Sequence, residues 1–233
     1  MKTSRSSKVL SCSLYSLAVL LVATTRCWGQ SNAEILSRLD QAAHSFSAAT
    51  ANISVTTHTA IIDEDDTQTG TVVVKRYSPT EMHFLITFSG AGAQALAFRG
   101  RTLQIYYCPE LNTVREYDIG KYKDLAQKLI LLGFGMTGQE LDANYEITNL
   151  GNEHVQDQDS LHLQLTPKAS EILKQLRKVD LWISLKNHCP VQQKFYLPGG
   201  DYRLVRFSDV EINPHLPKYA LDLPKTAKHE RVN

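Results

Sequence analysis

The residues whose spacing most resembles a chemical motif are three glycines, Gly133, Gly135 and Gly138. They form the pattern G-x-G-x-x-G, which in dinucleotide-binding proteins follows a strand, opens a helix and cradles a pyrophosphate. Here the pattern follows an apolar stretch with helical periodicity, and segments typical of antiparallel strands surround it. We therefore interpret it as a helix stop and a flexible hinge, and not as a nucleotide site.

A second candidate is the acidic run from Asp63 to Asp66. It resembles half of a calcium loop, but it lacks the central glycine and the distal glutamate of an EF-hand. A solvated hairpin tip explains four consecutive acids between two strand-like segments better than a metal site does.

No other pattern indicates catalysis. The chain contains neither a G-x-S-x-G nucleophile elbow nor an H-E-x-x-H pair. Its eight histidines show no ligand spacing, and His83 and His162 occupy the polar phase of expected strands. Carboxylates are not singled out as a pair by their spacing. We therefore expect no enzyme, no cofactor and no metal, and a periplasmic hydrolase is the least supported function.

The N-terminus has the features of a secretory signal peptide. Lys2, Arg5 and Lys8 precede a mostly apolar run from residue 9 to residue 23, and Gly29 offers a small residue at the cleavage point. The run is short for a membrane anchor, which is the alternative. A lipid-modified Cys27 is disfavoured because Arg26 precedes it. We expect residues 1–29 to be removed and residues 30–233 to form a single exported domain.

Charge and cysteine content restrict the partners of this domain. Residues 30–233 retain 21 basic and 24 acidic residues, a formal net charge of −3. Nucleic-acid binding is therefore disfavoured, because no net positive field would hold phosphates. Cys108 and Cys189 remain, each directly before a proline. Whether they stay as thiols or form a disulfide is open at this point, because sequence alone does not show that they are close.

Most of the domain alternates between apolar and polar residues, as half-buried strands do. We expect one N-terminal helix at Ala33 to Ala48, a second at Lys168 to Lys178 with Thr166 as its N-cap, and about 10 or 11 short strands, the last at Tyr219 to Leu223. Such close spacing of strands is typical of an all-β sandwich or barrel and not of βαβ units.

The main exception to this alternation is an apolar stretch between Leu125 and Met136. Leu125, Leu129, Leu132 and Met136 recur at i, i+4, i+7 and i+11, which places them on one helical face. A short apolar helix among strands must cover either an ordinary core or a ligand cavity. We expect it to be a lid, with Phe134 as a further lid residue.

Four stretches in this order resemble the LolA family of periplasmic outer-membrane lipoprotein carriers. They are Gly70 to Arg76, Gly100 to Pro109, Leu165 to Ser170 and Tyr219 to Lys225, with the apolar helix between the second and the third. The resemblance covers nearly the whole expected domain. It implies a mainly β fold, an incomplete antiparallel β-barrel closed by helices.

The resemblance also implies a function. A carrier of this kind is a monomer that receives lipoprotein acyl chains, or lipids, from an inner-membrane transporter and passes them to an outer-membrane receptor. The alternative on the same fold is a sensor that binds mislocalised lipoprotein and signals to a partner. A family arginine at the end of the Val-Lys-Arg strand holds the lid, and the matching residue is Arg76; a solvated arginine or a rim ion pair is the alternative for it.

The residues expected to line the cavity are the apolar members of the alternating segments. Acyl chains bind by apolar burial and require surface rather than chemistry, about 0.8 kcal/mol per methylene. Periodicity alone would favour an ordinary filled core, and it is the resemblance that favours a cavity. The predicted lining residues are Val72, Val74, Phe84, Ile86, Phe88, Phe98, Leu103, Ile105, Leu161, Leu163, Ile183 and Phe207.

Overall fold

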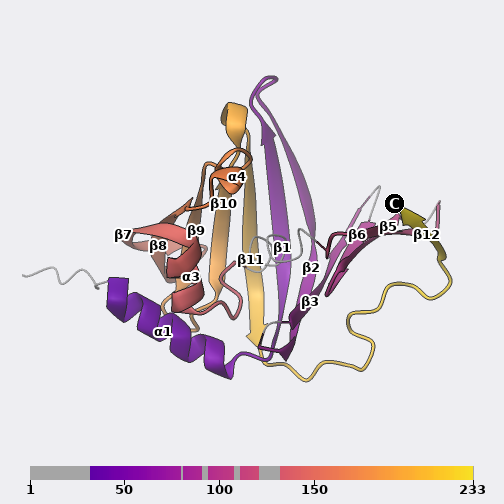
Figure 1. The fold of residues 1–233 in the computed structure, drawn as a ribbon, viewed down its shortest axis with the longest axis horizontal. Coiled ribbons are helices and arrows are strands. Elements are labelled where there is room, and N and C mark those ends of the chain that lie inside the picture. Colours follow the sequence, from indigo (N-terminus) through magenta and orange to yellow (C-terminus); the bar gives the residue numbers. More distant parts are fainter. Residues whose placement is uncertain (1–31, 80, 91–93, 108–110, 121–131, 233) are drawn as a thin grey trace, which may run out of the picture.

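The structure is a computed structural model that describes residues 32–79, 81–90, 94–107, 111–120 and 132–232. Twelve strands and three α-helices are found in these residues (Figure 1). The helices are α1 (Asn32–Ser45), α3 (Gly138–Asn144) and α4 (Ser170–Leu173), and a 3₁₀ turn spans Pro198–Gly200. The strands are β1 (Ala48–Thr59), β2 (Glu64–Ser78), β3 (Glu81–Phe88), β4 (Gln94–Arg99), β5 (Thr102–Tyr107), β6 (Thr113–Asp118), β7 (Tyr145–Val155), β8 (Gln158–Pro167), β9 (Lys178–Ser184), β10 (Pro190–Tyr196), β11 (Tyr202–Ile212) and β12 (Lys228–Val232).

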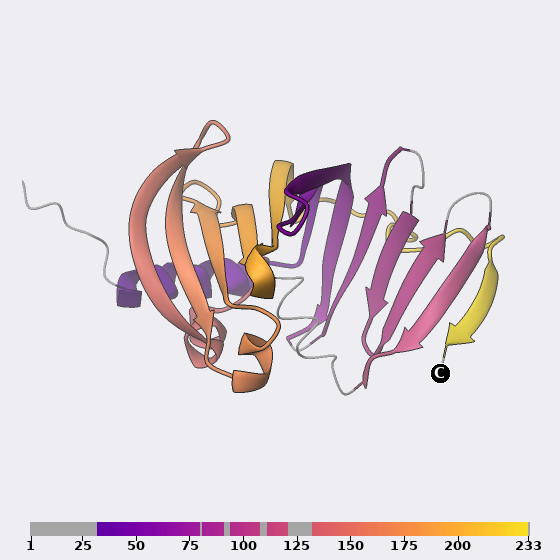
Figure 2. The same ribbon diagram turned by 90° about the horizontal axis from the view of Figure 1, so that it is seen from above.

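All twelve strands belong to one curved sheet, in the order β12-β6-β5-β4-β3-β2-β1-β11-β10-β9-β8-β7. Neighbouring strands are antiparallel except β12 and β6, which are parallel. The sheet stays open, with β12 at one end and β7 at the other (Figure 2). The predicted mainly β, incomplete antiparallel barrel is therefore confirmed.

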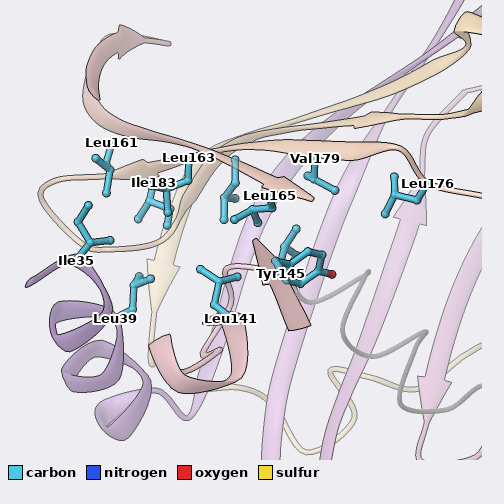
Figure 3. Packing of buried hydrophobic residues seen from close by; sticks show 12 residues of the cluster. Ile35, Leu39, Leu141, Tyr145, Leu161, Leu163, Leu165, Leu176, Val179 and Ile183 are labelled. Carbon is cyan, nitrogen blue, oxygen red and sulfur yellow. The ribbon is translucent and has the colours of Figure 1, made fainter. Parts of the chain in front are cut away.

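The β7 to β9 end of the sheet is closed by α1 and α3 (Figures 1 and 3). Helix α1 turns Ile35 and Leu39 toward Leu163 on β8, because residues four apart lie on one helical face. Leu141 of α3 and Tyr145 at the start of β7 pack into the same cluster, and both are at most 2% exposed. This end of the barrel is a filled core.

The C-terminal segment, residues 213–227, crosses the other end of the sheet before β12 pairs with β6 (Figure 1). Leu223 and Ala227 pack against Ala95 and Val114. Because these sheet residues alternate with those of the concave side, the segment covers the convex side. We call this segment the strap.

Several predicted elements differ from the structure within the described residues. The first helix ends at Ser45 and not at Ala48, and residues 132–136 of the expected lid helix form turns and irregular chain. The helix expected at Lys168 to Lys178 is shortened to α4, because β8 continues to Pro167 and β9 begins at Lys178. Thr166 therefore pairs with Glu146 in the sheet, and the residue before the helix is Ala169, which makes no side-chain cap.

The strand expected at Tyr219 to Leu223 is likewise wrong. This part of the strap forms a turn followed by irregular chain, and the terminal strand is β12. Leu221 and Leu223 alternate because both side chains are buried, Leu223 against the sheet, without joining its hydrogen-bond ladder.

Candidate functional site

A cavity of about 450 Å³ opens on the concave side of the sheet. This volume lies within the roughly 300–1,000 Å³ typical of small-molecule sites. Its walls come from the central strands β11, β1, β2, β3 and β4, from β10 and from α4. The lining residues are Ile53, Val55, Val72, Val74, Phe84, Ile86, Phe88, Leu96, Phe134, Glu171, Ile172, Gln175, Leu176, Gln193, Phe195, Leu197, Arg203, Val205 and Phe207.

Strand registry makes this surface continuous. Phe207 pairs with Ile53 and Val205 with Val55 across β11 and β1. Val74 likewise pairs with Phe84 across β2 and β3. Since side chains alternate along a strand, paired residues project on the same side, and apolar side chains follow one another from strand to strand.

The predicted cavity residues fall into three groups. Six line the cavity: Val72, Val74, Phe84, Ile86, Phe88 and Phe207. Phe98, Leu103 and Ile105 lie beyond it on the same side of the sheet, because Leu103 pairs with Phe98 and Ile105 pairs with Leu96. Leu161, Leu163 and Ile183 belong instead to the filled cluster beneath α1.

Sequence reasoning missed the wall formed by β10 and α4. Phe195 and Leu197 flank the end of β10, and Ile172 and Leu176 come from the short helical turn. Phe195 and Leu197 alternate in a segment recognised as a strand, so period two was a usable signal for them. Nothing local shows that α4 and β10 line the same cavity, because they are brought together by the curvature of the sheet.

The polar residues of the cavity have distinct positions. Glu171, Gln175 and Arg203 are exposed, so they mark the mouth. Gln193 is only 2% exposed, and its side-chain amide donates to the carbonyl oxygen of Leu132. This bond holds the described end of the predicted lid against β10.

The predicted lid is only partly described. Leu125 and Leu129 lie outside the described residues. Leu132 and Phe134 are almost fully buried, while Met136 is partly buried beside the cluster under α1. Phe134 contacts Phe207 edge to face at 5.2 Å between ring centroids and lines the cavity, so the end of this stretch covers part of the concave surface.

Arg76 connects three elements at this point. Its guanidinium donates to the carbonyl oxygen of Ala43 in α1 at 2.8 Å. It also donates to the carbonyl oxygen of Gly135 in the segment from Leu132 to Met136, which we call the covering segment. It also lies over the Phe46 ring, 5.6 Å from the centroid. Gly135 belongs to the stretch between Leu125 and Met136 that was expected to be a lid held by Arg76.

The structure accounts for each glycine of the G-x-G-x-x-G pattern without a nucleotide. Gly133 and Gly135 have φ angles of +85° and +62°, a conformation that favours glycine. Gly138 begins α3, and a Cβ there would overlap the backbone of Leu36 in α1. Asp40 of α1 in turn accepts a hydrogen bond from the Gly138 amide at 2.8 Å, so the motif fastens α3 to α1.

The convex side carries a polar network around His162. Its Nδ1 lies 2.8 Å from Glu153, and its ring stacks on Trp182 with centroids 4.1 Å apart. Hydrogen bonds that its carboxylate makes with the Trp182 indole and the His162 ring hold the pKa of Glu153 below its ordinary value. These groups contact each other on the outside of the sheet, and not at the cavity.

Cys189 is a free, buried thiol, and burial raises its pKa to about 12. Cys108, its possible disulfide partner, lies outside the described residues. Among the described residues, no three His, Cys, Asp or Glu side chains gather in a way that could hold a metal ion. No helix in the same residues is long and apolar enough to span a bilayer.

Fold and site together define a class: an open antiparallel half-barrel with an apolar cavity on its concave side. No protein-family profile matches the sequence, and no curated protein matches it. Among solved structures, an uncharacterized conserved protein from Thermus thermophilus matches with a TM-score of 0.54 at 12% identity, over 87% of this chain and 100% of that one. MucB matches with a TM-score of 0.54 at 12% identity, over 84% of this chain and 64% of MucB.

MucB from Pseudomonas aeruginosa has also been solved in complex with MucA. A LolA superfamily protein from Nitrosomonas europaea matches at 17% identity, over 81% of this chain and 97% of that one, with a TM-score of 0.38. Identities this low show the fold alone, and the chain shares that fold with MucB and the Thermus protein.

Proposed function

We propose that this protein is a carrier for acyl chains. In this account, lipoprotein or lipid chains occupy the concave cavity, and the protein moves them as a monomer through the periplasm from an inner-membrane transporter to an acceptor at the outer membrane. The observation that carries the proposal is the continuous apolar surface around the cavity, with exposed polar residues only at its mouth. Burial of each methylene contributes about 0.8 kcal/mol, so binding requires no catalytic group.

Arg76 acts in this proposal as a latch. It bonds α1 to the segment that carries Phe134, and Phe134 lines the cavity. Breaking the bond to Gly135 would loosen that segment, which Gln193 also holds at Leu132, while α1 remains held through Ala43. The latch therefore favours the closed, cargo-free state, and cargo favours the open one.

A binding titration with a fluorescent triacylated lipopeptide tests the acyl site. Ile86→Asp places a carboxylate in the cavity and should weaken binding at least tenfold, because an unpaired charge in an apolar site is costly. Thr87→Asp is the matched control, since Thr87 is the next residue on β3, exposed and on the opposite side.

A second variant tests the same cavity without a buried charge, in case Ile86→Asp fails to fold. Val205→Trp fills the cavity without adding charge and should also reduce binding. If correctly folded Ile86→Asp and Val205→Trp proteins both bind as tightly as wild type, the cavity is not the acyl site.

A sensor is the second candidate, favoured by the solved complex of MucB with MucA. A sensor would bind acyl chains in the same cavity but would not deliver them. Transfer of the labelled lipopeptide from donor to acceptor vesicles separates the two functions. Transfer faster than the spontaneous rate supports the carrier, whereas tight binding without transfer supports the sensor.

A further inference from the structure

The strap and the end of β2 form a cationic and aromatic patch on the convex side, away from the cavity. The patch consists of Lys75 and Tyr77 from β2, and of Lys218, Tyr219 and Lys225 from the strap. Lys75, Tyr77 and Lys218 border one cleft of about 170 Å³ between the strap and the sheet, which shows that residues far apart in sequence meet there.

Every lysine of this patch lies over a tyrosine ring. Lys75 Nζ is 5.1 Å from the Tyr77 centroid. Tyr219 is flanked by two lysines, with Lys225 Nζ at 4.4 Å and Lys218 Nζ at 5.5 Å. The two tyrosines are nevertheless exposed, Tyr77 by 54% and Tyr219 by 56%.

The charge of these lysines is not neutralised locally. Nearby acids have other partners: Glu81 contacts His83 at 2.8 Å, and Asp222 contacts Arg99 at 3.0 Å. Within the ranges that the structure describes, no carboxylate forms an ion pair with Lys75, Lys218 or Lys225. The patch therefore presents three uncompensated positive charges, although residues 30–233 carry a formal net charge of −3.

The position of the patch is structurally fixed. Arg99 on β4 donates to the carbonyl oxygen of Leu221 and to the carboxylate of Asp222, which fastens the strap to the sheet. Leu221 and Leu223 are buried beneath the strap, so the neighbouring Lys218 and Lys225 are held at the surface.

We propose that this patch docks the protein on an anionic phospholipid surface. Lysines near such a surface are attracted to its negative potential, and tyrosines are enriched at the headgroup level, where their rings are partly buried and their hydroxyls stay wet. Each lysine contributes roughly a fivefold increase in partition coefficient. The patch uses none of the cavity residues, so docking is independent of cargo.

Vesicle sedimentation tests this inference. Protein expressed from the full chain, in the form that the host cell processes, is sedimented with vesicles of phosphatidylcholine alone or with phosphatidylglycerol added. Wild type should bind the anionic vesicles at low salt and lose this binding as salt is added, because exposed charges are screened. The triple variant Lys75→Gln, Lys218→Gln, Lys225→Gln should bind roughly 100-fold more weakly.

The matched control removes the same charge elsewhere, through Lys168→Gln, Lys174→Gln and Lys186→Gln near α4 and the β9–β10 turn. If only the patch touches the surface, the partition coefficient of this control should lie within about twofold of that of wild type. Equal binding by the patch variant and the control overturns the proposal, as does a wild type that binds neither vesicle or both equally. Circular dichroism confirms that each variant is folded.

Discussion

Replacing Arg76 by leucine is the sharpest perturbation of the proposed closed state. The side chain makes two hydrogen bonds to backbone carbonyl oxygens, one in α1 and one at Gly135. A hydrogen bond from a charged donor contributes about 1.5–3 kcal/mol net. Only the bond to Gly135 breaks when the covering segment lifts, and the Phe46 contact adds about 0.5–1 kcal/mol if it breaks too.

Arg76→Leu should therefore weaken the closed state by about 2 kcal/mol or more, a shift of roughly 30-fold toward the open state. If the open state holds cargo, the variant should keep its lipopeptide and release it at least tenfold more slowly to acceptor vesicles. Arg76→Lys should be intermediate, because an ammonium cannot reach two carbonyls as the guanidinium fork does.

The assay loads each protein with fluorescent lipopeptide, adds acceptor vesicles and follows transfer over time. Arg101→Leu is the control, since it also removes an arginine charge, but from a side chain that is 71% exposed and paired with Asp118. If a folded Arg76→Leu protein releases the lipopeptide at the same rate as wild type, the latch is refuted. The acyl site would not be refuted by that result, because the binding titration tests it separately.

Three further predictions concern other parts of the fold. Gly138→Ala should lower the melting temperature by several degrees, because its Cβ would force α1 and α3 apart at a cost of about 1–3 kcal/mol. The control, Gln139→Ala, should leave the melting temperature nearly unchanged. Equal melting temperatures of the two variants would exclude the close contact between Gly138 and Leu36. The pKa of Glu153 is held below 4.5, so its contribution to stability is present above pH 4.5 and is lost as pH falls through the lowered value. In that pH window, the free energy of unfolding of Glu153→Gln should depend less steeply on pH than that of wild type. Parallel curves for the two proteins would contradict this. Cys189, with a pKa raised to about 12, should react with maleimide at pH 8 only as fast as the protein unfolds, as peptide mapping can show; rapid labelling of the native protein would contradict its burial.

Alternation of side chains was sufficient to predict the sheet, but not to separate its filled end from its hollow end. Ile86 and Leu163 have the same local pattern, yet Ile86 lines the cavity and Leu163 is buried under α1. The difference arises because α1 and α3 fill one end of the concave side, and these contacts join residues far apart in sequence. A period-two pattern carries no information about such distant partners.

Arg76 shows the opposite case. The resemblance marked it as the residue that holds the lid, and in the structure its guanidinium donates to the Gly135 carbonyl oxygen. That expectation depended on the resemblance, since an arginine at the end of a strand indicates no partner by itself. Gly138 was interpreted as part of a hinge, whereas its close approach to Leu36 serves helix packing.

Photo-crosslinking shows directly whether an acyl chain binds in the concave cavity. An acyl chain with a terminal diazirine is bound to the protein and activated, and the attachment sites are mapped by mass spectrometry. The account predicts attachment on the concave side, at residues such as Ile86, Phe88 and Val205, with loss of crosslinking in Ile86→Asp. Attachment mainly to the convex side, or crosslinking unchanged by a folded Ile86→Asp protein, would contradict it.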